Sequence, residues 1–279
     1  MPGKWYESAV PEDEPPGPQI DTSVPHIARI YDYWLGGKDN FAADRQVAEQ
    51  VLEVAPGVVE NVRANRAFLG RVVRYLAGQE GVRQFLDIGT GVPAADNTHE
   101  VAQAVAPETR VVYVDNDPIV LAHARALLTS RTGATAYIDA DIREPDKILA
   151  EAARTLDFGQ PVAVMMLAVL HVIGDDDDPY RIVARTMEAL PPGSFLTISH
   201  GANDIDTEVM ADVAGRLKTL MPAGQKPAFR DRAEVVRFFS GLELLEPGVV
   251  PVPEWRPSAG AAVAGRVPMW GGVARKPTS

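Results

Sequence analysis

The chain has 279 residues, of which 46% are hydrophobic, and its 27 basic and 38 acidic side chains give a formal net charge of −11. This length and composition predict a soluble globular protein with a sizeable core, while the acidic balance disfavours a nucleic-acid partner because like charges repel a phosphate backbone. The absence of cysteine excludes disulfides, thiolate metal sites and cysteine nucleophiles, and is typical of a cytoplasmic protein.

The N-terminus and the most apolar segment both predict a chain without a membrane partner. Residues 1–21 are rich in proline and acid, so we expect a flexible tail rather than a signal peptide. The run PVAVMMLAVLHVI, residues 161–173, is too short to cross a bilayer and predicts a buried strand with its exit loop.

Three helices are predicted in the segment 22–80. In the first, apolar residues recur at i, i+3, i+4, i+7 and i+8 from Ile27, and Ser23 is a plausible N-cap. The second covers about residues 41–54, and the third carries an apolar face over residues 58–76. We expect these helices to form a cap ahead of the rest of the chain.

From residue 83 onward, short apolar strands alternate with amphipathic helices. The strands are expected at 83–88, 110–115, 135–140, 161–168 and 194–199. The helices are expected near 95–105, 117–130, 145–155, 179–190, 209–220 and 231–241. This alternation is typical of parallel βαβ units with helices on both faces of the sheet.

Two further strands are predicted near the C-terminus, at residues 242–252 and 271–277. The segment between them is rich in proline and glycine and leaves no room for a helix, so antiparallel pairing is expected. The predicted fold is an α/β, doubly wound, Rossmann-like sheet of seven strands, mostly parallel with an antiparallel C-terminal pair. The expected parts are the tail 1–21, the helical cap 22–80 and the core 81–279.

Three acids stand at the carboxyl ends of the first three predicted strands, namely Asp87, Asp115 and Asp141. In a doubly wound sheet these ends line one crevice, which is where ligands bind. Gly89 and Gly91 follow the first strand and allow the backbone to approach a ligand closely. The pattern therefore predicts a ligand site built on strand ends.

The acids point to a ligand that contains adenosine. Asp115 is placed to accept hydrogen bonds from both ribose hydroxyls, and Asp141 from an adenine amino group, with Ile142 against the ring. Residues 89–94 also match the dinucleotide pattern G-x-G-x-x-A, which would suit NAD. Asp87, however, would repel a pyrophosphate and attract an ammonium or sulfonium group. The residues thus favour S-adenosylmethionine over NAD.

Several motifs then resemble a known family. FLDIGTG (85–91), VVYVDNDP (111–118) and YIDADIREP (137–145) resemble the first three motifs of class I S-adenosylmethionine-dependent methyltransferases. The segments at 26–44, 167–179 and 238–257 are similar to an actinobacterial methyltransferase family first defined as a domain of unknown function. The ordered set, spread over about residues 20 to 277, is specific, whereas the glycine loop taken alone is not.

The resemblance implies a class I methyltransferase fold and S-adenosylmethionine as cofactor, with S-adenosylhomocysteine as product. The predicted cofactor-binding residues are Asp87, Gly89, Gly91, Asp115, Asn116, Asp141, Ile142 and Leu167. Pro93 stands where many methyltransferases have a third glycine, so a different turn is expected at that point of the loop.

Four residues are candidates on the substrate side. His171 follows the fourth strand, where an acceptor would meet the methyl group of the cofactor; it is either a base or orienting group, or a residue packed under the loop. His200 ends the fifth strand and is a second histidine candidate. The resemblance implies that the N-terminal helices lie over the crevice, which makes Tyr33 and Asn40 candidates for contact with cofactor or substrate.

The acidic run at residues 175–178 is interpreted as a solvated loop rather than a magnesium or calcium site. Four adjacent acids cannot all face one ion, and Asp178 stands before Pro179, where it is expected to cap a helix. No metal is therefore expected.

The leading hypothesis is a methyltransferase that acts on a small molecule. Transfer from a sulfonium mainly requires alignment of donor and acceptor, so a dedicated base is optional. The fourth strand is not followed by the Asn/Asp-Pro-Pro-aromatic motif of amino-methylating nucleic-acid enzymes, and without cysteine the covalent route to carbon-five methylation of cytosine is closed. The alternatives are an NAD-dependent oxidoreductase and a non-catalytic S-adenosylmethionine-binding protein.

Overall fold

The computed structural model describes residues 21–120, 122, 134–258 and 266–278. Within this part of the chain the strands form one sheet of eight in the order β3-β2-β1-β4-β5-β8-β6, with β7 paired to β8 off this path. The strands are β1 (Gln84–Ile88), β2 (Arg110–Asp115), β3 (Thr135–Asp139), β4 (Ala163–Leu167), β5 (Phe195–Gly201), β6 (Glu243–Leu244), β7 (Val250–Pro251) and β8 (Met269–Arg275). Neighbouring pairs among the first five are parallel, and β8 is antiparallel to its three partners. The predicted mostly parallel sheet with antiparallel C-terminal strands is confirmed.

The strand expected over residues 242–252 is divided into β6 and β7, which both pair with β8. Between them, Pro247 has no N–H to donate to a ladder. Gly248 then adopts a φ of 85°, in the left-handed region that favours glycine. The chain therefore turns at this point, which adds a short eighth strand beside the predicted path of seven.

The helices agree with the predicted alternation wherever the structure describes them. They are α1 (Ile27–Leu35), α2 (Ala42–Val54), α3 (Val58–Gly78), α4 (Thr98–Val105), α6 (Pro145–Ala152), α7 (Pro179–Glu188), α8 (Thr207–Leu220) and α9 (Arg232–Arg237). The tail expected at 1–21, except for Asp21, and most of the helix expected at 117–130 lie outside the described residues.

The first helix begins later than its sequence pattern predicts. Its N-cap is His26, which has extended backbone angles, and not Ser23. The Ser23 hydroxyl instead donates a hydrogen bond to the Asp21 carboxylate at 2.6 Å, in the turn that precedes the helix. The helix ends as expected at Gly36, whose φ is 82°.

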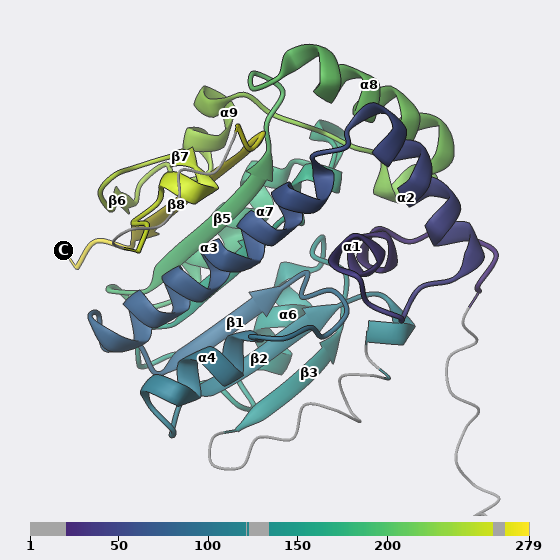
Figure 1. Cartoon of the computed structure of the whole chain (residues 1–279). Coiled ribbons are helices and arrows are strands. Elements are labelled where there is room, and N and C mark those ends of the chain that lie inside the picture. The colour runs from purple at the N-terminus through teal and green to yellow at the C-terminus, as the bar shows by residue number, and fades with distance from the viewer. Residues whose placement is uncertain (1–20, 121, 123–133, 259–265, 279) are drawn as a thin grey trace, which may run out of the picture.

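Helices cover both faces of the sheet (Figure 1). On one face, α3 and α4 pack through a buried cluster that includes Phe68, Leu76 and Val101. On the other face, α6, α7 and α9 pack through a second cluster that includes Ile148 and Ile182. α3 lies in the segment predicted as a cap, yet its buried side chains pack against the sheet; the division at residue 80 stays a prediction.

The remaining helices, α1, α2 and α8, form a third layer of their own. Ile30, Trp34, Val51 and Val213 share a buried cluster there with Val62 of α3. In Figure 1, α1 lies beyond the right-hand ends of β1 and β2, so this layer stands over the end of the sheet where the acids were predicted. None of the described helices is long and apolar enough to span a membrane.

Candidate functional site

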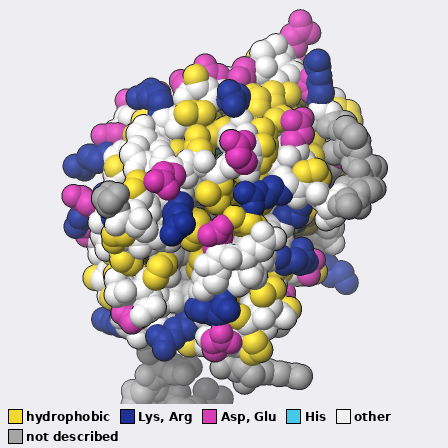
Figure 2. Space-filling model, turned by 90° about the vertical axis from the view of Figure 1, so that its left-hand side faces the viewer, with side chains coloured by type: hydrophobic (Ala, Val, Ile, Leu, Met, Phe, Trp, Pro, Cys, Tyr) yellow, Lys and Arg dark blue, Asp and Glu magenta, His cyan; other side chains and the backbone are white. Residues whose placement is uncertain are grey.

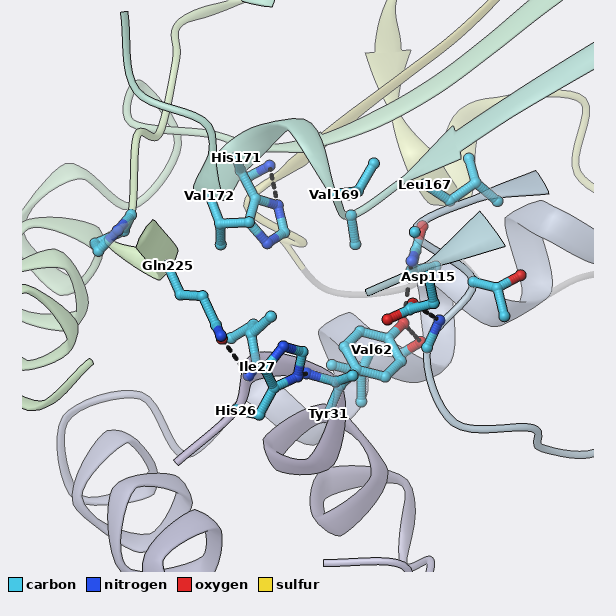
Figure 3. Close-up of a pocket in the computed structure, with 18 of the residues that line it drawn as sticks. His26, Ile27, Tyr31, Val62, Asp115, Leu167, Val169, His171, Val172 and Gln225 are labelled. Carbon is cyan, nitrogen blue, oxygen red and sulfur yellow. Dashed lines mark hydrogen bonds between the residues drawn. The ribbon is translucent and has the colours of Figure 1, made fainter. Parts of the chain in front are cut away.

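A cavity of about 210 Å³ lies at the carboxyl ends of the central strands, between the sheet and helices α1, α3 and α8 (Figure 3). Its wall includes every residue predicted to bind the cofactor, namely Asp87, Gly89, Gly91, Asp115, Asn116, Asp141, Ile142 and Leu167. The parallel topology brings these residues together, because strand ends that are distant in sequence meet at one edge of the sheet.

The loop after β1 requires its two glycines. Gly89 has a φ of 74° and Gly91 a φ of 68°, both in the left-handed region. A Cβ atom at Gly89 would also lie 2.4 Å from Cγ2 of Val169, which belongs to the loop after β4. The loop can therefore pass this close to the β4 loop only with glycine at position 89.

Asp115 is fixed in orientation by two backbone donors. Its side chain is 8% exposed, and its two oxygens accept hydrogen bonds from the Gly91 N–H at 2.8 Å and the Asp117 N–H at 3.0 Å. Burial raises the pKa of this carboxyl, although these two hydrogen bonds oppose the rise. The arrangement holds a carboxylate in place at the edge of the cavity, where further lone pairs can accept from a ligand.

Asp87 is buried beside it and carries no ion pair among the described residues. Its carboxylate accepts a hydrogen bond from the Thr98 hydroxyl at 2.6 Å. Burial raises the pKa of Asp87 to about 6, with Thr98 and the nearby Arg66 acting in the opposite direction. A cationic ligand group in the cavity would stabilise the ionised form of this carboxyl.

The third acid, Asp141, is tied to its neighbours. It accepts hydrogen bonds from the Asn116 amide at 2.9 Å and from the Arg143 guanidinium at 3.1 Å. Ile142, which is 7% exposed, lies next to it in the wall of the cavity. Together they offer an apolar surface edged by amide and carboxylate groups.

His171 lies on the opposite side of the cavity, in the 3-10 turn that follows β4 (Figure 3). Its Nδ1 accepts a hydrogen bond from the Gly201 N–H at 3.4 Å. Burial, and to a smaller extent the positive charge of Arg230, together lower the pKa of His171 to about 4. The imidazole is therefore neutral near neutral pH.

The comparisons with known proteins agree with this geometry. A sequence model of the S-adenosyl methyltransferase family matches residues 13–277. The chain belongs to this family. A comparison with curated proteins finds no match.

Two solved structures are similar over nearly the whole chain. A DUF574 family protein from Streptomyces avermitilis has 45% identity and a TM-score of 0.89, with 93% of this chain and 100% of that chain covered. A candidate methyltransferase from Thermobifida fusca has 41% identity and a TM-score of 0.86, with coverage of 94% and 98%. The plantazolicin methyltransferase BpumL, solved with a pentazolic desmethylPZN analogue and S-adenosylhomocysteine, shares only the fold, with 11% identity and a TM-score of 0.52 over 89% of this chain and 95% of that chain.

In this family member the cavity also contains residues that the sequence analysis missed, on α1 and α3. Asn65 is 4% exposed, and its Nδ2 donates a hydrogen bond to the Tyr31 hydroxyl at 3.0 Å. Its Oδ1 is buried and has no hydrogen-bond partner among the described residues. The signal was present in the sequence, because Asn65 is a polar residue on the apolar stripe of its helix, between Val62 and Leu69.

Three predicted substrate-side residues lie outside the cavity wall. Tyr33 points to the surface, where its hydroxyl donates a hydrogen bond to Glu49 at 3.3 Å. Asn40 is buried and donates to Asp32 at 2.9 Å, which closes the turn between α1 and α2. His200 is fully buried behind the wall, so it packs against the fold instead of facing a ligand.

The acidic run at 175–178 is engaged within the fold. Asp175 pairs with Arg230 at 2.6 Å and Asp177 pairs with Arg143 at 2.9 Å. Asp178 caps α7, as predicted, by accepting a hydrogen bond from a backbone N–H in its first turn. Across the described ranges, no group of three or more side chains is arranged to hold a metal ion.

Proposed function

We propose that this chain binds S-adenosylmethionine in the cavity and transfers its methyl group to a small-molecule acceptor. The observation that carries the proposal is the buried carboxyl of Asp87, which has a raised pKa and faces the same cavity as Asp115. A ligand with an adenosine at one end and an ammonium group at the other satisfies both acids. A pyrophosphate would instead place negative charge beside Asp87, which disfavours NAD.

The residues present fit such a cofactor. Asp115 would accept hydrogen bonds from the ribose hydroxyls, and Ile142 would pack against the adenine. Asp87 and the unpaired Oδ1 of Asn65 would receive the ammonium group, since an orphaned buried acceptor is relieved by a charged donor. When bound, S-adenosylmethionine supplies an electrophilic methyl group on a sulfonium.

The protein's part in the reaction is alignment and exclusion of water. α1 and α8 enclose the cavity opposite the strand ends, so a bound acceptor would be held away from bulk solvent. Holding two reactants in line supplies a large share of the rate enhancement in such displacements. The position of the cavity, between the strand ends and helices α1 and α8, supports a small molecule as the acceptor.

The test is thermal unfolding of the protein with S-adenosylhomocysteine, with NAD, and with neither. A ligand present at about a hundred times its dissociation constant adds about 2.7 kcal/mol to the free energy of unfolding. For a domain of this size the midpoint should rise by at least about 5 °C with S-adenosylhomocysteine. A shift with NAD alone would contradict the proposal.

A further inference from the structure

The cavity has a second wall that the predicted cofactor-binding residues do not form. We call it the distal wall, and it consists of the lining residues that follow β4 in the chain. They include Val172, Met210, Val213, Leu217, Phe229 and Met269. Among the described residues, no Asp, Glu, Lys or Arg belongs to this wall. The charged lining residues, such as Asp32, Arg66 and Arg143, come from earlier segments of the chain.

The distal wall is held in place by specific packing. α8 presents Met210, Val213 and Leu217 on one face, at helical spacing. The Phe229 ring lies against Gly201, where a Cβ atom would be 2.6 Å from Cδ1 of the ring. The backbone N–H of the residue before Phe229 donates to the carbonyl oxygen of His171 at 2.7 Å, which joins this segment to the loop after β4.

Only two side chains of the distal wall are polar, His171 and Gln225. The Oε1 of Gln225 already accepts a hydrogen bond from the Ile27 N–H at 2.9 Å. Nδ1 of His171 faces the Gly201 N–H, so the neutral ring carries its proton on Nε2. Figure 3 shows the ring directed into the cavity between Val172 and Val169, and no described residue partners its Nε2.

These features select the kind of molecule that can occupy this side of the cavity. A charged molecule would lose its hydration against the distal wall and find no charged side chain in it, which is strongly unfavourable. The guanidinium of Arg143, which donates a hydrogen bond to the Gly224 carbonyl oxygen of this wall at 3.1 Å, is already paired with Asp141 and Asp177. An apolar molecule gains from the same burial. If that molecule carries one hydrogen-bond acceptor, the Nε2–H of His171 can donate to it.

We propose that the distal wall is the methyl-acceptor subsite and that the acceptor is an uncharged, mainly apolar small molecule whose oxygen accepts a hydrogen bond from Nε2–H of His171. This inference rests on the proposed function, because it assumes that the cofactor fills the other half of the cavity.

The first experiment measures binding of three ring-matched probes by calorimetry, to full-length protein saturated with S-adenosylhomocysteine. The probes are naphthalene, methoxynaphthalene and naphthalenesulfonate. We expect methoxynaphthalene to bind about threefold to tenfold more tightly than naphthalene, as one neutral hydrogen bond predicts. The sulfonate should bind at least about a hundredfold more weakly than methoxynaphthalene. Equal or tighter binding of the sulfonate, or no binding of either neutral probe, overturns the proposal.

Variants locate the subsite. His171→Phe keeps a ring but removes the donor, so it should abolish the preference for methoxynaphthalene over naphthalene. Met210→Glu places a charge in the distal wall and should lower the affinity for both neutral probes at least about tenfold. Its matched control is Val209→Glu on the exposed side of the same helix, which should leave the affinity for both neutral probes unchanged.

Measuring the binding of S-adenosylhomocysteine distinguishes a failure of the acceptor proposal from a failure of the proposed function. Each variant should retain it, which shows that the variant is folded and that the cofactor half of the cavity is intact. If the wild-type protein does not bind S-adenosylhomocysteine, the proposed function itself is wrong. If it does bind and His171→Phe leaves the preference between the two neutral probes unchanged, the acceptor proposal is wrong while the proposed function stands.

Discussion

At the scale of single residues, Asp87 combines a cost to folding at neutral pH with the binding role proposed for it. Its pKa is raised to about 6 by burial, so the folded protein favours the protonated acid relative to the unfolded chain. The stability from this preference is present below the ordinary pKa of 3.8 and is lost as the pH rises through about 6. A cationic ligand reverses the preference, since it pairs with the ionised form.

We expect the pH dependence of ligand affinity to reflect the ionisation of the Asp87 carboxyl. The affinity for S-adenosylhomocysteine should rise with pH, by up to about tenfold per pH unit below about pH 6, and level off above it. Asp87→Asn should weaken binding and remove this dependence, because the amide does not ionise. Calorimetry from about pH 5 to about pH 8 makes the measurement.

The same variant provides its own control for folding. Without ligand, Asp87→Asn should raise the free energy of unfolding at about pH 8, on the order of 1–3 kcal/mol, because the buried charge is gone. A variant that binds weakly and is also less stable than the wild type would show that Asp87 is a structural residue only.

Substitution of Asn65 tests whether the amino-acid end of the cofactor lies against α3. Asn65→Leu removes the unpaired acceptor, so the affinity for S-adenosylhomocysteine should fall by about tenfold to a hundredfold, as expected for a lost hydrogen bond to a charged group. Methylthioadenosine, which lacks the amino-acid end, should bind as it does to the wild type. An equal loss for both ligands would place the effect elsewhere, in the packing of Tyr31 and α3.

At the scale of elements, Arg230 organises the loop that carries His171. Its side chain is 3% exposed, and it donates hydrogen bonds to the carbonyl oxygens of Leu170 at 3.3 Å and Ile173 at 3.2 Å. It also lies 3.0 Å from Nε2 of His200. The histidine at the end of β5 therefore helps to place the β4 loop, although it does not line the cavity.

Removing this arginine should loosen the loop and destabilise the protein. Arg230→Met leaves buried carbonyl groups without their donor, and we expect a loss of about 3–5 kcal/mol in the free energy of unfolding. Urea denaturation makes the measurement. Arg185→Met is the control, because Arg185 is exposed and its ion pairs with Asp146 and Glu188 contribute little. Similar losses for both variants would contradict the role given to Arg230.

At the scale of the whole molecule, α3 is fastened to the segment at residues 252–255, which precedes the last strand. Arg71 donates hydrogen bonds to the carbonyl oxygens of Trp255 at 3.0 Å and Val252 at 2.6 Å. The rings of Phe68 and Trp255 meet edge to face, with centroids 5.6 Å apart. The C-terminal segment is thus fastened to the helix that lines the cavity, so the stability of the two should be coupled.

Gly271 in β8 is the position where this contact is tightest. A Cβ atom there would lie 2.8 Å from Val252 Cγ1 and 3.1 Å from Phe68 Cζ. We expect Gly271→Val to lower the free energy of unfolding by about 1–3 kcal/mol, through overpacking. Gly215→Ala, in an exposed and open part of α8, should instead raise it by about 0.5–1 kcal/mol. Urea denaturation tests both, and an unaffected Gly271→Val would show that α3 and β8 can separate without cost.

The net charge of −11 does not make every face of the molecule uniformly acidic (Figure 2). On the face shown in Figure 2, basic and acidic side chains are interspersed with hydrophobic patches, and neither sign dominates. A mixed surface of this kind gives no steering toward a polyanion on that face. Recognition in the proposed function therefore depends on the cavity.

The order of most strands and helices could be predicted from local sequence patterns, as could the positions of Asp87, Asp115 and the glycine loop. Hydrophobic residues that recur every two residues indicate a strand, and those that recur about every 3.6 residues indicate a helix. In a parallel sheet the carboxyl ends of the strands then lie at one edge, which places the residues that follow them. Tyr33 and Asn40 show the limit of such patterns, because both are polar and close in sequence to lining residues but lie outside the cavity wall. Tyr33 bonds to Glu49, and Asn40 bonds to Asp32 in the turn after α1.

Which polar groups share one cavity depends instead on how distant segments pack in three dimensions. Asn65 lies 22 residues before Asp87 on a different element, and no local pattern relates the two. The distal wall likewise draws on α8, the loop after β4 and the segment before α9. Contacts between such segments follow from how helices pack on the sheet, and the packing of many side chains at once sets that arrangement.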